Sequence, residues 1–292
     1  MTYDNDTYWV GLHRQYRGTL KAVGWPSLSE AFNAAKYRSE TESFLSVLKT
    51  FWSPAKPSVA VLEIGIGIGF WTALMIQNLK QCDMQFTGLD ISEEALTAVR
   101  AHFPKAHLEH ADIRRLDPNR FMHAFDLVTA LMVLLHLTTA SEFENALRLA
   151  ARSVRPGGML ILYEPAVTEP YSPWLFPGRT STHSSVARAL DLYDKPLVEE
   201  GLTRIGMLPG ASWVLNGPIE ASTERAYRSR DIMWRTFCQA IYRFESITGW
   251  FSPVASWLDS MLKRRSKGGS GKFLVYRRHV DSSFLIHPAT CR

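Results

Sequence analysis

Three glycines stand at alternate positions directly after an apolar run, in the segment Glu63-Ile64-Gly65-Ile66-Gly67-Ile68-Gly69. Glycines at such a turn allow positive φ angles and let the backbone approach a ligand closely. If a helix follows, its first N–H groups are unpaired and can bind a polar or anionic group. The segment is therefore a candidate nucleotide-binding loop, with a purely structural glycine turn as the simpler alternative.

A dinucleotide-binding loop is the main competing interpretation. Its pattern, Gly-x-Gly-x-x-Gly, requires its third glycine at the position of Phe70, whereas Gly69 comes one residue earlier. An acid, Glu63, stands two residues before the first glycine. The spacing therefore favours a different class of nucleotide-binding loop.

The same segment resembles motif I of the class I S-adenosylmethionine-dependent methyltransferases, whose pattern is an acid, x, Gly, x, Gly, x, Gly. The resemblance is strong over residues 58–165 and looser in the flanks. It implies S-adenosyl-L-methionine as the cofactor. The residues that it assigns to the cofactor in this loop are Glu63, Gly65, Gly67 and Gly69.

Two later acids match further landmarks of that family. Asp90 stands 21 residues after Gly69, and the resemblance implies that it accepts hydrogen bonds from both ribose hydroxyls, with Ile91 beside it. A carboxylate suits a vicinal diol because it can accept two hydrogen bonds at once. The resemblance also implies that the Asp112 side chain and the Ile113 backbone N–H bind adenine. Taken singly, either acid could be a helix cap or a turn former.

The flanks resemble, on weaker motifs, a bacterial branch of small-molecule or glycan methyltransferases in which an N-terminal helix closes over the cofactor. These motifs are Tyr8-Trp9 and Ala22-Val23-Gly24-Trp25-Pro26. Tyr37 or Arg38 would then bind the methionine carboxylate, although a packed tyrosine and an exposed arginine are equally ordinary. Leu131-Met132 stands where the family often has a polar residue, which predicts an apolar floor for the methyl-transfer site.

Methyl transfer from a sulfonium needs no protein nucleophile, because the enzyme mainly aligns the reactants and sometimes removes a proton. The candidate bases are His136, His183 and Glu164, and the candidate acceptor-binding residues are Arg188 and Trp174. Ligands bind at the carboxyl ends of parallel strands, which favours His136 and Glu164. The alternatives are that His136 only caps residues 132–137 and that His183 and Arg188 are surface residues.

These residues require an alternation of short strands and helices, which the apolar pattern predicts from about Ser58 onward. Strands are predicted at residues 59–64, 85–89, 107–110, 125–130, 159–163 and 272–276, and helices at 70–80, 92–102 and 141–153. Ser92 is a predicted N-cap, and Arg155-Pro156-Gly157-Gly158 a predicted turn.

We therefore predict an α/β fold, with a Rossmann-like, doubly wound, mostly parallel sheet, N-terminal helices and a C-terminal helical, aromatic cap. The predicted parts are an N-terminal helical cap at 1–50, a cofactor-binding core at 51–165, a substrate cap at 166–271, and a final strand and tail at 272–292. Aromatic residues in the cap favour an apolar or sugar-like acceptor, unless they form only the core of the cap.

Charge raises the question of other partners. The chain has 292 residues, a net charge of +5 and a pI of about 9.1, but residues 263–278 alone carry seven basic and no acidic side chains. This segment is either a solvated turn or a contact with an anionic acceptor or membrane surface, rather than a nucleic-acid site. A membrane contact through residues 247–262 is another alternative, but Gly249 and Pro253 argue against one continuous amphipathic helix there.

Three isolated cysteines, Cys82, Cys238 and Cys291, have neither metal-site nor disulfide spacing. With no secretory signal at the N-terminus, they predict a cytoplasmic protein without a metal site. The predicted activity is methyl transfer from S-adenosylmethionine to a small molecule or glycan, with oxygen preferred as the acceptor atom. An RNA or protein methyltransferase and a non-catalytic cofactor-binding regulatory protein remain alternatives. The sequence predicts neither the acceptor nor the oligomeric state.

Overall fold

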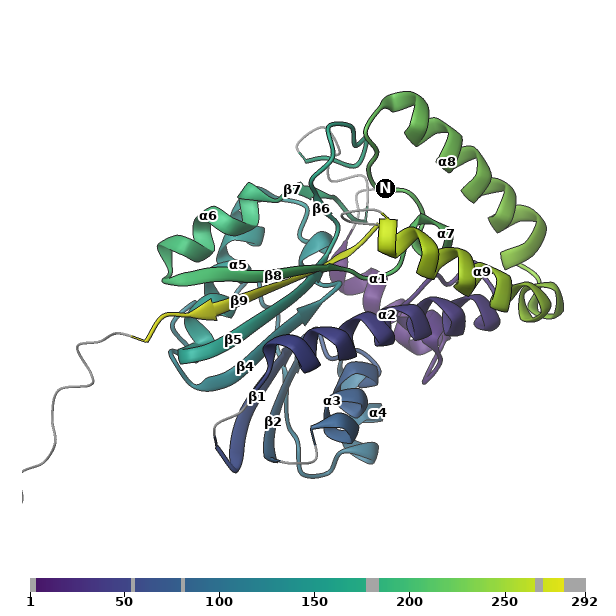
Figure 1. The fold of residues 1–292 in the computed structure, drawn as a ribbon. Coiled ribbons are helices and arrows are strands. Elements are labelled where there is room, and N and C mark those ends of the chain that lie inside the picture. Colours follow the sequence, from purple (N-terminus) through teal and green to yellow (C-terminus); the bar gives the residue numbers. More distant parts are fainter. Residues whose placement is uncertain (1–3, 54–55, 80–81, 177–183, 266–269, 281–292) are drawn as a thin grey trace, which may run out of the picture.

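One central sheet organises the protein (Figure 1). The computed structural model describes residues 4–53, 56–79, 82–176, 184–265 and 270–280, and within them seven strands form this sheet in the order β3-β2-β1-β4-β5-β9-β8. The strands are β1 (Ser58–Ile64), β2 (Asp83–Asp90), β3 (His107–His110), β4 (Phe125–Leu131), β5 (Val154–Glu164), β8 (Leu202–Pro209) and β9 (Lys272–Arg278).

The order of the strands creates a switch point at the centre of the sheet. Strand β1 pairs in parallel with β2 on one side and with β4 on the other, so the chain winds outward in both directions from β1. Strand β9 lies antiparallel between β5 and β8, which confirms the predicted final strand. Ligands of such sheets bind at the carboxyl ends of the strands beside the switch point.

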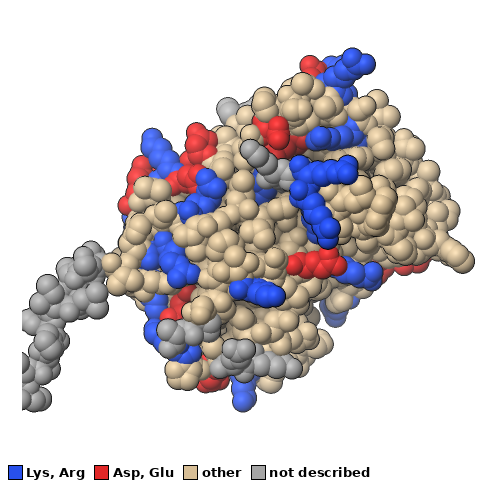
Figure 2. Space-filling view, viewed as in Figure 1, with Lys and Arg blue, Asp and Glu red and all other residues tan. Residues whose placement is uncertain are grey.

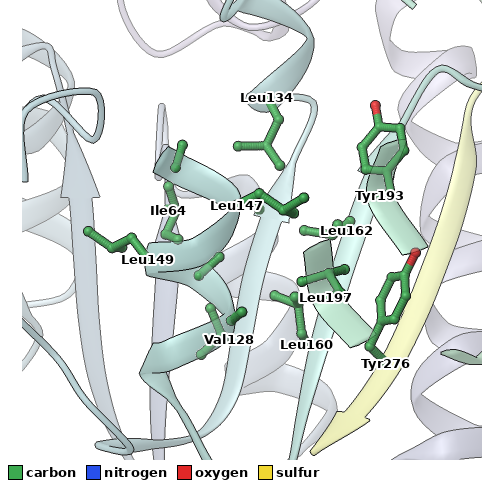
Figure 3. Packing of buried hydrophobic residues seen from close by; sticks show 14 of the residues in the cluster. Ile64, Val128, Leu134, Leu147, Leu149, Leu160, Leu162, Tyr193, Leu197 and Tyr276 are labelled. Carbon is green, nitrogen blue, oxygen red and sulfur yellow. The ribbon is translucent and has the colours of Figure 1, made fainter. Parts of the chain in front are cut away.

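Helices cover both faces of the sheet, as the doubly wound prediction requires. One face packs against α2 (Glu30–Phe51), α3 (Phe70–Asn78) and α4 (Glu93–His102), and the other against α5 (Ala140–Ser153) and α6 (Asp191–Glu199). Figure 3 shows the second layer, where Leu147 of α5 and Tyr193 of α6 pack beside Leu162 of β5. Ser92 caps α4 as predicted, since its hydroxyl accepts a hydrogen bond from the Ala95 N–H.

The predicted boundary of the substrate cap at residue 166 is wrong, because α6 and β8 belong to the core. Strand β8 forms the edge of the sheet beside β9, and its pairing is irregular between Arg204 and Gly206. Gly206 lies against the Phe51 ring, where a Cβ atom would be 2.2 Å from Cζ. This irregular, glycine-containing strand lacks the continuous apolar run that marks β1, β4 and β5.

The remaining cap is helical and has a small core of its own. It comprises α7 (Trp213–Asn216), α8 (Glu224–Phe237), the π-helical segment η3 (Cys238–Tyr242) and α9 (Glu245–Arg265). Aromatic residues from these helices pack against Phe32 at the start of α2. Many of the cap aromatics therefore serve the packing of the cap itself.

Helix α9 is continuous, contrary to the expectation that Gly249 and Pro253 would interrupt it. Proline has no N–H, so the carbonyl of Gly249, four residues earlier, loses its helical partner. The Ser252 hydroxyl donates a hydrogen bond to that carbonyl at 3.1 Å. This local replacement compensates for the missing backbone donor.

The structure contradicts two further expectations about the C-terminal half. Residues 155–158 were expected to form a turn but belong to β5, with an irregular register opposite β4. The basic segment 263–278 is not one exposed cluster. Lys272 is fully buried and pairs with Glu220 at 2.5 Å, and Lys263 pairs with Asp259 at 3.3 Å.

Short elements complete the chain around the carboxyl ends of the strands. They are α1 (Asn5–Gln15), the 3-10 turns η1 (Leu20–Ala22) and η2 (Leu134–His136), and the small strand pair β6 (Ala166–Val167) and β7 (Arg188–Ala189). Helix α1 lies beside α4 and is fixed by two ion pairs, Asp6–Arg114 and Arg14–Glu94, each at 2.5 Å. Among the described helices, none has the length and apolar character needed to cross a membrane.

Candidate active site

A pocket opens at the switch point, between the carboxyl ends of β1, β2 and β4 and the helices α1 and α2. The enclosed cavity measures about 120 Å³, and the space including its open mouth is about 970 Å³. Eight predicted site residues line this one pocket. They are Tyr37, Gly65, Gly67, Asp90, Ile91, Asp112, Ile113 and His136.

The glycine loop has the backbone geometry that its sequence predicts. Gly65, Gly67 and Gly69 all have positive φ, at 71°, 53° and 75°. A Cβ atom on Gly67 would lie 2.8 Å from Val23, and one on Gly65 would lie 2.4 Å from Val133. Gly69 does not line the pocket but forms the left-handed N-cap of α3. The glycines therefore serve close packing of the loop as well as access to a ligand.

Asp90 combines a structural and a potential ligand-binding role. Its two carboxylate oxygens accept one hydrogen bond each, from the N–H groups of Gly67 and Ser92, at 2.8 and 2.9 Å. A carboxylate has about four acceptor positions, so one on each oxygen stays available for a pair of hydroxyls. Burial raises the pKa of Asp90, although His13 and the surrounding N–H groups oppose that shift.

Asp112 and Ile113 lie at the pocket, but the contacts of Asp112 are those of a turn. Its carboxylate accepts hydrogen bonds from the backbone N–H and the Nε of Arg114, at 3.0 and 2.9 Å. It also forms an ion pair with Arg115 at 3.2 Å. The turn-forming alternative therefore describes its observed bonds, and its predicted contact with adenine stays a prediction.

Helix α1 contributes pocket residues that the sequence reasoning did not select, namely Asn5, Trp9 and His13. His13 is 4% exposed, and neither ring nitrogen has a hydrogen-bond partner among the described residues. Burial lowers its pKa, while the nearby carboxylates of Asp90 and Glu94 act in the opposite direction. A buried imidazole without partners, beside Asp90, is suited to bind a polar group of a ligand. Only the position of Trp9 in a family-like motif hinted at this helix.

The α2 wall differs from the expectation for the methionine carboxylate. Tyr37 lines the pocket, but its hydroxyl donates to the Val23 carbonyl at 3.0 Å. Arg38 is exposed and lies outside the pocket, because it falls on the opposite face of α2. The charged groups on the inner side are Glu40, which lines the pocket, and Lys36, which pairs with it at 2.7 Å.

Glu63 lies behind the glycine loop rather than in the pocket. It is 1% exposed, and its Oε2 accepts a hydrogen bond from the Thr72 hydroxyl at 2.6 Å. Burial raises its pKa to about 8, with Thr72 opposing and Asp90 adding to the shift. Its contacts join the end of β1 to α3, so its predicted contact with the cofactor is indirect at most.

The side of the pocket next to β4 is apolar, as Leu131-Met132 predicted. Leu131, Met132, Val133 and Leu137 line it, together with Trp9 from α1. Met132 has a φ of +59°, a left-handed conformation that is costly for this side chain. Its N–H donates to the Tyr163 carbonyl at 2.7 Å, which holds the conformation in place.

His136 is the only predicted base that lines the pocket in the described part of the chain. Its Nδ1 lies 2.6 Å from the carbonyl oxygen of Ser184. Because a carbonyl only accepts, Nδ1 carries the proton and Nε2 has a free lone pair. Burial lowers the pKa of His136 to about 4, so the ring is neutral at neutral pH. The Trp9 ring packs edge-on against it, with centroids 4.7 Å apart.

Glu164 and Arg188 lie outside the pocket, which contradicts their expected roles as base and acceptor-binding residue. Glu164 is fully buried, and its Oε1 accepts hydrogen bonds from the N–H groups of Val133 and Leu134, at 3.1 and 2.8 Å. Arg188 is also buried and donates to the carbonyls of Leu134 and Leu137. Together, these two side chains hold both ends of η2, the turn that carries His136.

The last two predicted residues give no support to a site. Trp174 lies away from the pocket, and its indole N–H donates to the Tyr227 hydroxyl of α8 at 2.9 Å. It therefore joins the segment after β6 to the cap. His183 falls outside the described residues.

Comparison with protein families agrees with the geometry of the glycine loop. Residues 61–158 match the methyltransferase domain family. This range runs from β1 into β5 and contains Asp90, Asp112 and His136. The match therefore covers the strands on both sides of the switch point.

Curated relatives share parts of the chain. A polyketide synthase-nonribosomal peptide synthetase of Pyricularia oryzae is 25% identical over 231 residues, which are 72% of this chain and 6% of that protein. A ubiquinone biosynthesis O-methyltransferase of Bradyrhizobium diazoefficiens is 28% identical over 106 residues, 35% of this chain and 38% of that protein. The chain thus spans well under half the length of these relatives.

Solved structures share the fold at low identity. A chain from the complex of the Haloferax volcanii Trm112 methyltransferase activator with a methyltransferase has a TM-score of 0.52 and 13% identity, covering 96% of this chain and 100% of that chain. The [4+2]-cyclase SpnF has a TM-score of 0.50 and 16% identity, covering 83% and 82%. One of these structures is named as a methyltransferase and the other as a cyclase, so the shared fold does not define the reaction.

The sheet order, the glycine loop and the family match define a class I S-adenosylmethionine-dependent methyltransferase domain. Residues 61–158 match the methyltransferase domain family, and this match indicates S-adenosylmethionine as the cofactor. The pocket suits this cofactor. Asp90 retains acceptor positions for a diol, the positive-φ glycines leave backbone accessible, and His13 offers two unpartnered nitrogens.

Proposed function

We propose that the protein transfers a methyl group from S-adenosylmethionine to a hydroxyl of a small, largely apolar molecule. The observation that carries this proposal is His136, a neutral imidazole in the pocket with Nδ1 bonded to Ser184 and Nε2 free. An imidazole held in one tautomer is suited to accept a proton from a hydroxyl. The methyltransferase domain match supplies the class of reaction.

The cofactor would be held by the wall formed at the ends of β1, β2 and β3. Asp90 would accept hydrogen bonds from the ribose hydroxyls, and the backbone of Gly65 and Gly67 would line the adjoining part. Asp112 and Ile113 stand where adenine would lie. When bound, the cofactor supplies an electrophilic methyl group on a sulfonium sulfur.

His136 would act as the general base for the acceptor. Its Nε2 would accept the proton of the acceptor hydroxyl, and the ring would become an imidazolium. The bound cofactor would supply the methyl group, whose bond to the sulfonium sulfur breaks as the bond to the hydroxyl oxygen forms, and would leave as the neutral thioether. Burial makes the imidazolium costly, so the proton is passed on to water when the product leaves. Glu164 and Arg188 act as positioning residues because they fix η2 and hence the direction of the imidazole.

The lining of the acceptor side favours an apolar body over a glycan. Leu131, Val133, Leu137 and Trp9 would contact the acceptor without offering charged groups. The ubiquinone biosynthesis O-methyltransferase among the relatives supports a small acceptor methylated on oxygen. We also propose a cytoplasmic location, on the basis of the isolated cysteines.

Calorimetry tests the first part of this proposal. The protein is titrated separately with S-adenosylmethionine and with NAD, and we expect heat of binding only with the former. Binding of NAD alone would overturn the proposed cofactor. Substituting Asp83→Ala, at the exposed start of β2, is a matched control for Asp90→Ala at its end.

A labelling screen tests the transfer itself. The protein is incubated with methyl-labelled S-adenosylmethionine and either phenolic and alcoholic small molecules, glycans or cell extract, and the products are identified by mass spectrometry. We expect the label on an oxygen of an apolar small molecule. A label only on glycan, RNA or protein would refute the proposed acceptor class, and cofactor binding without any labelled product would refute transferase activity.

A further inference from the structure

Helix α9 carries an exposed apolar stripe outside the cap core. Trp250 is 88% exposed and Trp257 60%, and Ile247 and Val254 are each 48% exposed. Their spacing of three and four residues places these four side chains along one side of the helix. We call these four residues the α9 stripe. Exposed tryptophans in a row are unusual, because a large indole is ordinarily at least partly buried.

The opposite side of α9 is the side that packs on the protein. Thr248, Ala255 and Asp259 are buried there, and α9 crosses α2 on this side (Figure 1). Phe251 and Leu262 contribute to the core of the cap. The α9 stripe is therefore surplus to the packing that holds the helix in place.

The charges around the α9 stripe are basic. Arg243 stands before the stripe, and Arg264 and Arg265 follow it; all three are exposed, and no ion pair involves them within the described ranges. In Figure 2 the area over α9 is largely free of charged side chains, and basic side chains gather near the end of α9 that lies at the centre of the view.

The two acids of this helix do not offset these arginines at the surface. Glu245 accepts hydrogen bonds from the N–H groups of Glu30 and Ala31 at the start of α2, at 2.9 and 3.0 Å. Asp259 is 1% exposed and accepts hydrogen bonds from the Ser39 hydroxyl and the Ser212 N–H. Both carboxylates are thus engaged in holding the cap to the rest of the protein.

We propose that the α9 stripe and its three flanking arginines dock the protein on an anionic lipid bilayer. Indole rings favour the boundary between head groups and acyl chains, and guanidinium groups are attracted to anionic head groups. An apolar stripe with basic ends and no free acid matches such a surface in both hydrophobicity and charge. The helix lies on the bilayer and does not cross it.

Charge disfavours a second copy of the chain as the occupant of this face. In an antiparallel pairing of two α9 helices, Arg243 of one copy would lie near Arg264 and Arg265 of the other. In a parallel pairing, each arginine would lie near its own counterpart. Both arrangements bring like charges together, whereas an anionic bilayer satisfies all three arginines.

Vesicle binding tests this proposal. The 292-residue protein is sedimented with phosphatidylcholine vesicles and with vesicles that also contain phosphatidylglycerol. We expect at least about tenfold stronger binding to the anionic vesicles, since three arginines are attracted to the anionic head groups. The same mixture should shift the tryptophan emission to shorter wavelength, and added salt should weaken binding.

Two double variants separate the apolar and the basic parts. W250S/W257S and R264E/R265E should each lower binding to anionic vesicles by at least about tenfold. Matched controls are V198S/M122S, at exposed apolar positions elsewhere, and R17E/K105E, which changes the net charge equally. The controls should bind vesicles as the wild type does, and all four variants should keep the affinity for S-adenosylmethionine, which shows that they fold.

Three outcomes would overturn the assignment. The first is a wild type that does not bind anionic vesicles, and the second is a W250S/W257S variant that binds them as tightly as the wild type. In the third outcome, the wild type forms a dimer that W250S/W257S converts to monomer, with no vesicle binding by either. That result assigns the α9 stripe to a second copy of the chain. None of these outcomes depends on the proposed methyl transfer.

Discussion

The two walls of the pocket differ in how their residues are held. The proposed cofactor wall is formed by the ends of β1, β2 and β3, where the Asp90 carboxylate accepts hydrogen bonds from the N–H groups of Ser92, two residues later, and of Gly67 in the glycine loop. The acceptor wall depends on distant segments, since η2 is held by Glu164, Arg188 and Ser184. The cofactor wall is thus built from a few short loops, and the acceptor wall from long-range tertiary contacts.

The largest expected effect concerns the cofactor wall. Asp90→Ala would remove the two proposed charge-assisted hydrogen bonds to the ribose, at about 1.5–3 kcal/mol each, so the affinity for S-adenosylmethionine should fall at least about 100-fold. Calorimetry measures this change, with Asp83→Ala unchanged as the control. Retained affinity in the Asp90 variant would place the ribose elsewhere.

The next effect concerns the acceptor wall. His136→Ala should lower kcat by about 100-fold and leave the affinity for S-adenosylmethionine within about twofold, because the base acts on the acceptor. His107→Ala, at an exposed position of β3, is the control. Equal loss of cofactor affinity and turnover would mean that the two walls do not work separately.

The pH dependence of the wild-type rate also tests the role of His136 as the base. Because burial lowers the pKa of His136 to about 4, Nε2 is unprotonated at higher pH, and protonation removes activity only as the pH falls towards that value. Initial rates measured between about pH 4 and about pH 8 should therefore show no fall as the pH decreases through the ordinary histidine pKa of about 6.5. A fall in rate near pH 6.5 that is absent from His136→Ala would mean that His136 titrates with an ordinary pKa, as a water-exposed imidazole does.

A smaller effect on stability involves one buried acid behind each wall. Burial raises the pKa of both Glu63 and Glu164 to about 8, so the folded state holds these protons more tightly than the unfolded chain, where the pKa is about 4.3. The contribution of these two acids to the free energy of unfolding is greatest below about pH 4.3 and is lost as the pH rises towards about 8.

Thermal unfolding should therefore show a Tm lower by roughly 2–4 °C or more at about pH 8 than at about pH 6. Glu63→Gln and Glu164→Gln should each reduce this difference, because an amide has no proton to lose. Exposed Glu42→Gln should leave it unchanged. A Tm that rises with pH over this range would show that both acids are ionised in the fold.

The smallest effect tests whether α1 belongs to the cofactor wall. His13→Ala should weaken binding of S-adenosylmethionine by about fivefold, the value of about one hydrogen bond, with kcat at saturation unchanged. Exposed Gln15→Ala on the same helix serves as the control. A loss of kcat without a change in affinity would move His13 to the acceptor wall.

Sequence reasoning predicted the parts of the site that depend on local pattern. The positive-φ glycines, Asp90 and His136 all follow short apolar strands, and all but Gly69 line the pocket. It misplaced Arg38, Glu164 and Arg188. Each is a charged residue of a type that often binds ligands. The position of a residue around its helix, and its burial in the fold, decide which way such a side chain points.

The sequence by itself determined the order of strands β1 to β5, the glycine loop and the methyltransferase class, because apolar periodicity and positive-φ glycines act over a few residues. Tertiary structure decided the rest. It made β8 an edge strand, let α9 continue through Pro253, buried Lys272 against Glu220 and left Trp250 exposed. These outcomes depend on which distant surfaces meet, since burial and ion pairing arise between segments far apart in the chain.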